Sequence, residues 1–171
     1  MTKAGIKAIF VFAATVSLPA QPPAPAIITS EAILNAPLDD VWKAWTTREG
    51  IESWMVAKTD FKLEIGATWR TSYSKESTLD DDSTIQHLIL AYDQGRMLAF
   101  RTVKPPKGFP FPSALAKTWT VVYLEPRGAA KTHITVRMNG YTEDEESQKM
   151  RAFFERGNRI TLESLVKRFE K

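Results

Sequence analysis

The sequence predicts an α+β domain in which a curved, seven-stranded antiparallel sheet wraps around a long C-terminal helix, with two short helices after the first strand. Three observations predict this class. Short β-rich runs separated by turn residues fill the middle of the chain. Neighbouring strands that are joined by such short turns are antiparallel. One long helical pattern over residues 142–171 is the only element large enough to bury the apolar face of the sheet.

The predicted domain begins with one strand and a short helix. Residues 27–34 are rich in β-branched side chains, which favours a strand. Residues 35–46 favour a helix, because Pro37 suits the first helical position and two aspartates suit its positive end. The apolar side chains of this helix recur at helical spacing and form one stripe: Leu38, Val41, Trp42 and Trp45.

Three of the five tryptophans cluster early in the predicted domain. Trp42 and Trp45 belong to the apolar stripe, and such stripes are more often core than binding surface, so we interpret both as packing residues. Trp54 follows a break in this pattern and belongs to a second predicted helix with Ile51 and Met55. We expect Trp54 to be the tryptophan that reaches a cavity.

Six further segments complete the predicted sheet. Each is rich in β-branched or aromatic residues and is bounded by glycine, proline or aspartate. They are residues 59–65, 68–74, 83–92, 96–103, 118–125 and 132–138.

A proline-rich loop over residues 104–117 separates two of these strands and holds Phe109 and Phe111 between prolines. A stiff aromatic loop of this kind could cover the mouth of a cavity, or touch a membrane or a partner. The alternative is that it folds back onto the core.

The predicted C-terminal helix begins with Thr142 as N-cap and Glu145 three residues later. Small and polar residues occupy the middle of its apolar face, where leucine or isoleucine would fill a core. We interpret them as leaving room and polar groups for a bound molecule; the alternative is a close approach of the sheet. The apolar arc is Met150, Phe153, Phe154, Ile160 and Leu165, and the small or polar residues are Gly157, Asn158, Thr161 and Ser164.

The first residues differ in composition from the predicted domain. Lys3 and Lys7 precede an apolar run over residues 8–18 and a proline-rich stretch, which is typical of a secretory signal peptide. The run is shorter than the roughly 20 apolar residues that span a bilayer. We therefore expect a signal peptide and tether over residues 1–26, one domain over residues 27–171, export to the periplasm or beyond, and no membrane span in the mature chain. A buried N-terminal helix is the alternative.

Composition excludes several classes of function. The chain has no cysteine, which excludes thiol catalysis, disulfides and cysteine-bound metals. Its net charge is +3, and loss of Lys3 and Lys7 leaves 21 basic against 20 acidic side chains, so we expect no nucleic-acid partner. His87 and His133 lie far apart in the sequence without carboxylates at ligand spacing, so we expect no metal and no cofactor.

The segment "APLDDVWKAWTTREGIESWM" (Ala36 to Met55), with "IGATWR" and "YDQGRMLAFR" later in the chain, resembles the helix-grip superfamily of START-like or SRPBCC domains. The most similar branch is the polyketide-cyclase-like group that includes the C-terminal domain of the heat-shock ATPase activator. The resemblance covers essentially the whole predicted domain. It implies a helix-grip fold with a cavity between the sheet and the C-terminal helix.

Three functions are compatible with these observations. The first is a carrier without catalytic residues that binds a small lipophilic or amphipathic molecule in the cavity. The second is a cyclase- or hydrolase-like enzyme with an inward acid or base such as His87, Arg70 or Arg101. The third is a protein-interaction module similar to the ATPase activator. For the first, the expected ligand-binding residues are Trp54, Phe109, Phe111, Phe154, Gly157, Asn158, Thr161 and Ser164.

Overall fold

The computed structural model describes residues 26–170 and confirms the predicted α+β class. The predicted signal peptide lies outside these residues, apart from Ala26, which opens the first strand. The elements in chain order are β1 Ala26–Leu34, α1 Leu38–Thr46, α2 Arg48–Glu52, β2 Lys58–Asp60, β3 Thr68–Ser72, β4 Ile85–Asp93, β5 Met97–Lys104, α3 Pro112–Leu115, β6 Trp119–Pro126, β7 Thr132–Tyr141 and α4 Glu145–Arg168.

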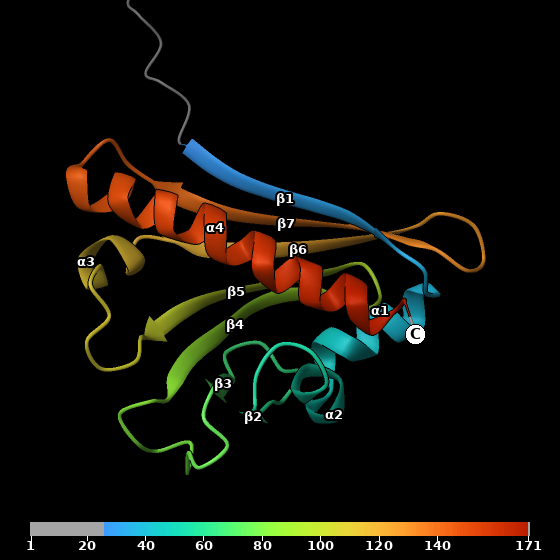
Figure 1. Cartoon of the computed structure of the whole chain (residues 1–171), viewed down its shortest axis with the longest axis horizontal. Coiled ribbons are helices and arrows are strands. Elements are labelled where there is room, and N and C mark those ends of the chain that lie inside the picture. The colour runs from blue at the N-terminus through green and yellow to red at the C-terminus, as the bar shows by residue number, and fades with distance from the viewer. Residues whose placement is uncertain (1–25, 171) are drawn as a thin grey trace, which may run out of the picture.

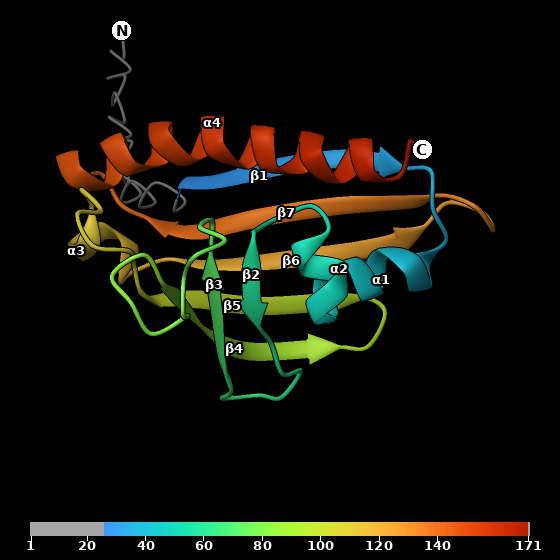
Figure 2. The same ribbon diagram turned by 60° about the horizontal axis from the view of Figure 1, so that its bottom comes forward.

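All seven strands form one antiparallel sheet in the order β1-β7-β6-β5-β4-β3-β2. The first strand therefore pairs with the last, although almost the whole domain separates them in sequence. Figures 1 and 2 show the result: the sheet curls so that β2 and β3 run across the direction of β6 and β7, and α4 crosses the inside of the curve from α3 to α1.

The ends of the short helices differ slightly from the prediction. Pro37 is the N-cap of α1 rather than its first residue, and α2 ends at Glu52, so Trp54 and Met55 follow the helix instead of belonging to it. The predicted strand over residues 59–65 stops at Asp60, because the apolar side chains that follow leave the sheet and pack on the core.

The proline-rich loop contains a short helix, α3, that the sequence analysis did not predict. Pro112 occupies its first turn, where the missing N–H costs nothing. Ala114 and Leu115 are buried in this helix and hold the loop against α4.

The N-cap of α4 is Asp144, and the prediction of Thr142 is wrong. The Asp144 carboxylate accepts a hydrogen bond from the backbone N–H of Ser147 at 2.9 Å. Thr142 lies two residues earlier, where its backbone N–H donates to the Ser147 hydroxyl at 2.9 Å. A carboxylate at this position also interacts favourably with the positive end of the helix, which a threonine hydroxyl does not match.

We expect Asp144→Ala to lower the free energy of unfolding by about 1 kcal/mol, the usual cost of losing an N-cap. Chemical denaturation of the variant measures this. Glu143→Ala is the matched control, since Glu143 is an exposed neighbour outside the cap. Equal stability of the Asp144→Ala and Glu143→Ala proteins would show that the cap bond contributes nothing.

The buried face of α4 is rotated relative to the predicted arc. Met150 and Leu165 are fully buried as expected, but Phe153 and Ile160 are 52% and 53% exposed. Leu162, which the predicted arc left out, is 8% exposed and belongs to the core. The helix is covered by the sheet along one side only, so apolar residues on the flank of the arc remain at the surface.

The core consists of two separate apolar clusters. The larger surrounds α1 and the far end of α4 and includes Trp42, Trp45, Trp69 and Leu165. The smaller lies under α3 and the start of α4 and includes Met150, which is fully buried. α4 packs on β1 and β7 at one edge of the sheet, and residues of both clusters line a cavity between the sheet and α4.

Candidate functional site

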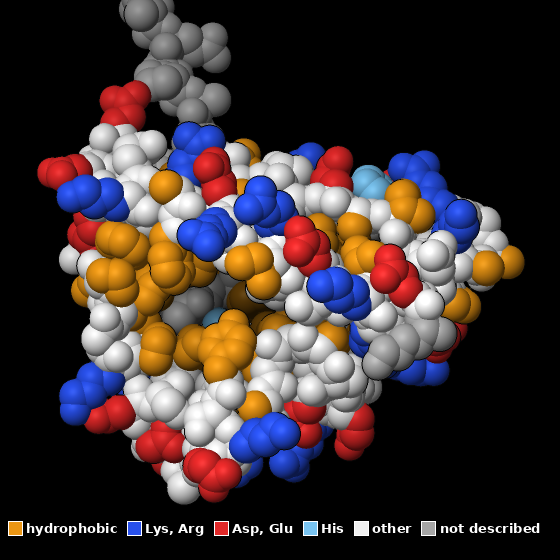
Figure 3. Space-filling view, viewed as in Figure 1, with side chains coloured by type: hydrophobic (Ala, Val, Ile, Leu, Met, Phe, Trp, Pro, Cys, Tyr) orange, Lys and Arg blue, Asp and Glu red, His pale blue; other side chains and the backbone are white. Residues whose placement is uncertain are grey.

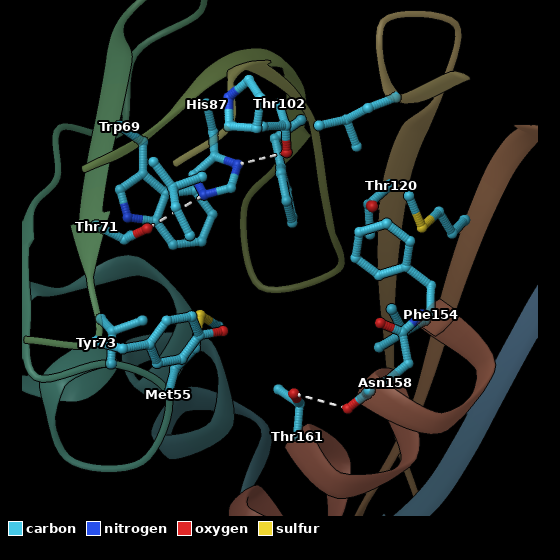
Figure 4. A pocket seen from close by; sticks show the side chains of 18 of the residues that line it. Met55, Trp69, Thr71, Tyr73, His87, Thr102, Thr120, Phe154, Asn158 and Thr161 are labelled. Atoms are coloured by element: carbon cyan, nitrogen blue, oxygen red, sulfur yellow. Dashed lines mark hydrogen bonds between the residues drawn. The ribbon is translucent and has the colours of Figure 1, made fainter. Parts of the chain in front are cut away.

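A cavity of about 370 Å³ lies between the curled sheet and α4, and both core clusters contribute to its walls. Its volume falls within the range of small-molecule sites. Figure 3 shows the mouth as a hollow rimmed by hydrophobic side chains, with a histidine visible inside. Side chains from β3, β4 and β5 form one wall and side chains from α4 form the opposite wall (Figure 4). The lining is predominantly apolar.

Six of the eight expected ligand-binding residues line this cavity, and two do not. The six come from the segment after α2, the proline-rich loop and α4, and the cavity brings them together across more than a hundred residues of sequence: Trp54, Phe109, Phe154, Gly157, Asn158 and Thr161. Phe111 packs on the smaller core cluster instead. Ser164 lies on α4 beyond the cavity and its hydroxyl donates to the Ile160 carbonyl at 3.1 Å. The rotation of α4 explains why Ser164 misses the cavity.

Gly157 faces open space. A β-carbon built on Gly157 would meet no atom within 4 Å other than those of its chain neighbours and its own helix backbone. The alternative explanation for the small residues was a close approach of the sheet, and at Gly157 this explanation is wrong. Thr161 lies one turn further along the same wall, and its hydroxyl donates to the Gly157 carbonyl at 3.0 Å, so the helix itself satisfies the Thr161 hydrogen.

Trp54 reaches the cavity as expected, and its position is well defined. Its indole N–H donates to the Ala44 carbonyl at the end of α1, at 2.9 Å, which leaves the ring to form part of the cavity wall. Trp45 packs edge-on against Trp54 with a ring distance of 4.9 Å. Trp42 and Trp45 are both buried core residues, in agreement with the packing interpretation, although Trp45 also lines the cavity.

The sheet wall contains residues that the sequence analysis did not assign to the ligand site. Trp69 is 1% exposed and donates to the Thr59 hydroxyl at 2.8 Å, and its ring lies 4.9 Å from the ring of His87. Phe100 completes this aromatic group, 5.0 Å from Trp69. The alternation of side chains along β4 could have indicated that His87 points inward, because His87 lies two residues before buried Ile89 and shares its strand face.

Of the three candidate catalytic residues, His87 lines the cavity, whereas Arg70 and Arg101 do not. Its Nδ1 lies 3.1 Å from the Thr102 hydroxyl, and its Nε2 lies 3.3 Å from the Thr71 hydroxyl. Burial lowers the pKa of His87 from 6.5 to about 4, because the interior disfavours the charged ring. The imidazole is therefore neutral at physiological pH.

The two arginine candidates lie away from the cavity. Arg70 forms ion pairs with Asp60 and with Asp80, the latter at 2.7 Å, on the outer side of the sheet. Arg101 is exposed on β5. No Asp, Glu, Lys or Arg side chain of residues 26–170 lines the cavity.

Four phenylalanines form an aromatic cluster at the mouth of the cavity, which we call the mouth cluster: Phe109, Phe111, Phe153 and Phe154. Phe109 comes from the proline-rich loop and contacts both α4 rings, at 6.1 and 6.2 Å between ring centroids. The loop thus closes one side of the mouth, where Phe109 and Phe111 both contact Phe153 of α4.

We expect Phe109→Ala to accelerate release of a bound dye while lowering the free energy of unfolding by less than about 2 kcal/mol, since a fully packed phenylalanine would cost about 3–5 kcal/mol. Stopped-flow fluorescence with the uncharged dye Nile red measures the release rate. Phe111→Ala is the matched control, because Phe111 belongs to the same cluster but not to the cavity wall. Equal release rates in both variants would exclude a gating role for Phe109.

No three His, Asp or Glu side chains of residues 26–170 are grouped as metal ligands would be. None of the helices in this range is long and apolar enough to cross a membrane.

Comparison with solved structures gives many similar folds. The Mesorhizobium loti protein MLL2253 has a TM-score of 0.67 with 18% identity over 85% of this chain and 97% of its own. The Aha1 dimer from Colwellia psychrerythraea gives 0.66 with 14% identity over 85% and 96% of the two chains. CalU16 from Micromonospora echinospora gives 0.60 with 20% identity over 82% and 71%. These identities establish the fold alone.

A search of curated proteins found no significant match. The family model of Activator of Hsp90 ATPase homolog 1-like proteins, in contrast, matches residues 35–170, which span both walls of the cavity. This agrees with the resemblance seen in the sequence to the helix-grip superfamily. The chain therefore belongs to the family of Activator of Hsp90 ATPase homolog 1-like proteins.

Proposed function

We propose that the protein binds a small lipophilic or amphipathic molecule in the cavity between the sheet and α4. The observation that carries the proposal is the open space in front of Gly157, inside an apolar cavity of about 370 Å³. An unfilled apolar space of this size weakens a core, since its lining side chains lose their packing partners. A ligand that fills it recovers those contacts.

Two measurements test this function. An organic extract of the purified protein, analysed by mass spectrometry, should contain one molecule in stoichiometric amount that denatured protein does not retain. Nile red, which is uncharged and apolar, should bind the extracted protein with one site per chain and be displaced by the extracted molecule. An empty extract together with no Nile red binding would overturn the proposal.

A cyclase- or hydrolase-like enzyme that uses the same cavity is the second candidate, and the inward position of His87 favours it. Its neighbours are threonine hydroxyls rather than a carboxylate, and its pKa of about 4 makes it a weak base at neutral pH. Incubation of the extracted molecule with wild-type and His87→Gln protein separates the two functions. A product formed by the wild type alone would establish the enzyme.

Family membership favours a third candidate, a protein-interaction module that activates an Hsp90-type ATPase. The test is the ATPase rate of an Hsp90-type chaperone with and without the protein. A rate that rises with added protein, and rises equally with a variant whose cavity is filled, would place the function on the outer surface.

We also propose that the protein is exported, on the evidence of the basic start and apolar run in the first residues. The mature N-terminus should then begin between Gln21 and Ile27. N-terminal sequencing of protein from a host that exports it measures this. Folded protein that retains Met1 would contradict export and would be compatible with a cytosolic chaperone partner.

A further inference from the structure

The sheet wall of the cavity carries a chain of three hydrogen-bonded polar side chains. Thr71 of β3, His87 of β4 and Thr102 of β5 lie side by side, with contacts of 3.3 and 3.1 Å to the two ring nitrogens (Figure 4). Strand pairing places them there: His87 is directly opposite Thr102 in the β4–β5 register and opposite Trp69 in the β3–β4 register. The three side chains therefore form one polar group within an apolar wall.

This chain has unused hydrogen-bonding capacity. A neutral imidazole carries one N–H, so it donates to one threonine and accepts from the other. The threonine that accepts keeps its own O–H, and the threonine that donates keeps its lone pairs. Among residues 26–170 neither hydroxyl has a second hydrogen-bond partner, and Thr71 is only 2% exposed. Both threonines line the cavity, so the spare donor and acceptor are available to a molecule that binds there.

The position of the proton on His87 decides which threonine donates and which accepts. A shift of the proton from one ring nitrogen to the other reverses both ends of the chain. The hydroxyl of Thr71 and the hydroxyl of Thr102 are therefore each able to present either a donor or an acceptor to a ligand. A hydroxyl and a carbonyl are both satisfied by such a group.

The rest of the cavity excludes charge. No carboxylate, ammonium or guanidinium group of the described residues lines it, and His87 is neutral at pH 7 because burial lowers its pKa to about 4. An ionised ligand group would lose its hydration without gaining a partner, which is strongly unfavourable. The polar group on the ligand is thus expected to be neutral.

Resting on the proposed function, we propose that the Thr71–His87–Thr102 chain binds a hydroxyl or carbonyl group of an uncharged ligand, whose apolar body lies between the aromatic side chains of the sheet wall and α4. Trp69 stands beside the chain and Phe154 faces it from α4 (Figure 4). The ligand class is therefore a neutral alcohol, phenol or ketone with a hydrophobic body, and not a fatty acid or another carboxylate.

Three probes with the same bicyclic body test this: naphthalene, naphthol and naphthoate. Calorimetric or fluorescence titration at pH 7 should show naphthol binding roughly tenfold more tightly than naphthalene, which corresponds to one net hydrogen bond. Naphthoate should bind at least about 100-fold more weakly than naphthol. In Thr102→Val and His87→Phe the preference for naphthol over naphthalene should fall to near unity, with the affinity for naphthalene retained.

Ser164→Ala is the matched control, because Ser164 lies on α4 away from the cavity wall and donates its hydrogen to its own helix. It should keep the tenfold preference. Thr102→Val is nearly isosteric and decides the matter if His87→Phe fails to fold. Equal binding of naphthol and naphthalene, or naphthoate that binds as tightly as naphthol, would overturn the inference and leave the proposed function standing. Failure of all three probes to bind would overturn the inference, while the organic extract and the Nile red titration decide the proposed function separately.

Discussion

Replacement of Gly157 by leucine is expected to lower the affinity for Nile red by about 100-fold, with a Tm that is unchanged or higher. The added side chain enters the open space in front of Gly157 and occupies volume that the dye requires. Glycine within a helix costs roughly 0.5–1 kcal/mol relative to alanine, and leucine removes most of that cost. The leucine also buries apolar surface against the cavity wall. Binding and stability should therefore change in opposite directions.

Ser164→Leu is the matched control for this variant. Ser164 lies on the same helix but not on the cavity wall, so its replacement should leave Nile red affinity within about twofold of the wild type, since distant, independent sites act separately. Fluorescence titration and thermal melts of both proteins provide the measurement. A strongly destabilised Gly157→Leu protein would mean that the wall is closely packed. Normal dye affinity in a stable Gly157→Leu protein would place the binding site elsewhere.

Acidification from pH 7 to pH 4 is expected to remove about 3 kcal/mol of stability through His87 alone. The pKa of His87 is about 4 in the folded protein and 6.5 as the ordinary value of the unfolded chain. Below pH 6.5 the unfolded chain therefore takes up a proton that the folded protein does not bind, and unfolding becomes more favourable. The contribution of His87 is complete above pH 6.5, declines as the pH falls, and levels off below about pH 4.

The measurement is urea unfolding of wild-type and His87→Gln protein at pH 7, 5.5 and 4. Glutamine keeps hydrogen-bonding capacity between Thr71 and Thr102 without titrating in this range. Carboxylates elsewhere in the molecule titrate in both proteins, so the difference between the two pH profiles isolates His87. Parallel profiles would show that the ring is charged, or solvated, in the folded protein.

The order of the strands and of every helix except α3 was predictable from the sequence, because each depends on local patterns. Alternating β-rich runs and the turn residues between them indicated all seven strands, although the second was predicted too long. The acidic start of α4 indicated where that helix begins, but several side chains there could accept the N-cap hydrogen bond. The choice of Asp144 over Thr142 depends on a backbone conformation that residue type alone does not specify.

The candidate site was predictable only in part. Helical spacing indicated that small and polar residues of α4 share a face, and Gly157, Asn158 and Thr161 do line the cavity. The spacing did not establish how α4 is rotated on the sheet, so Ser164 was included and Phe153 was expected to be buried. His87 was considered as a candidate, but its inward position depends on the curl and register of β3, β4 and β5.

Gly140 and Gly157 show a property that the sequence does not predict, namely how much space lies in front of a residue. Gly140 at the end of β7 has a φ of +91°, and a β-carbon there would lie 2.2 Å from the Lys117 carbonyl oxygen. Gly157 is also a single glycine in a structured segment, yet a β-carbon there would meet nothing. The sequence by itself determined the fold class, the order of every element except α3, and a helix face with missing volume. Only the tertiary structure decided that the volume is empty, because the space in front of a residue is set by side chains distant in sequence.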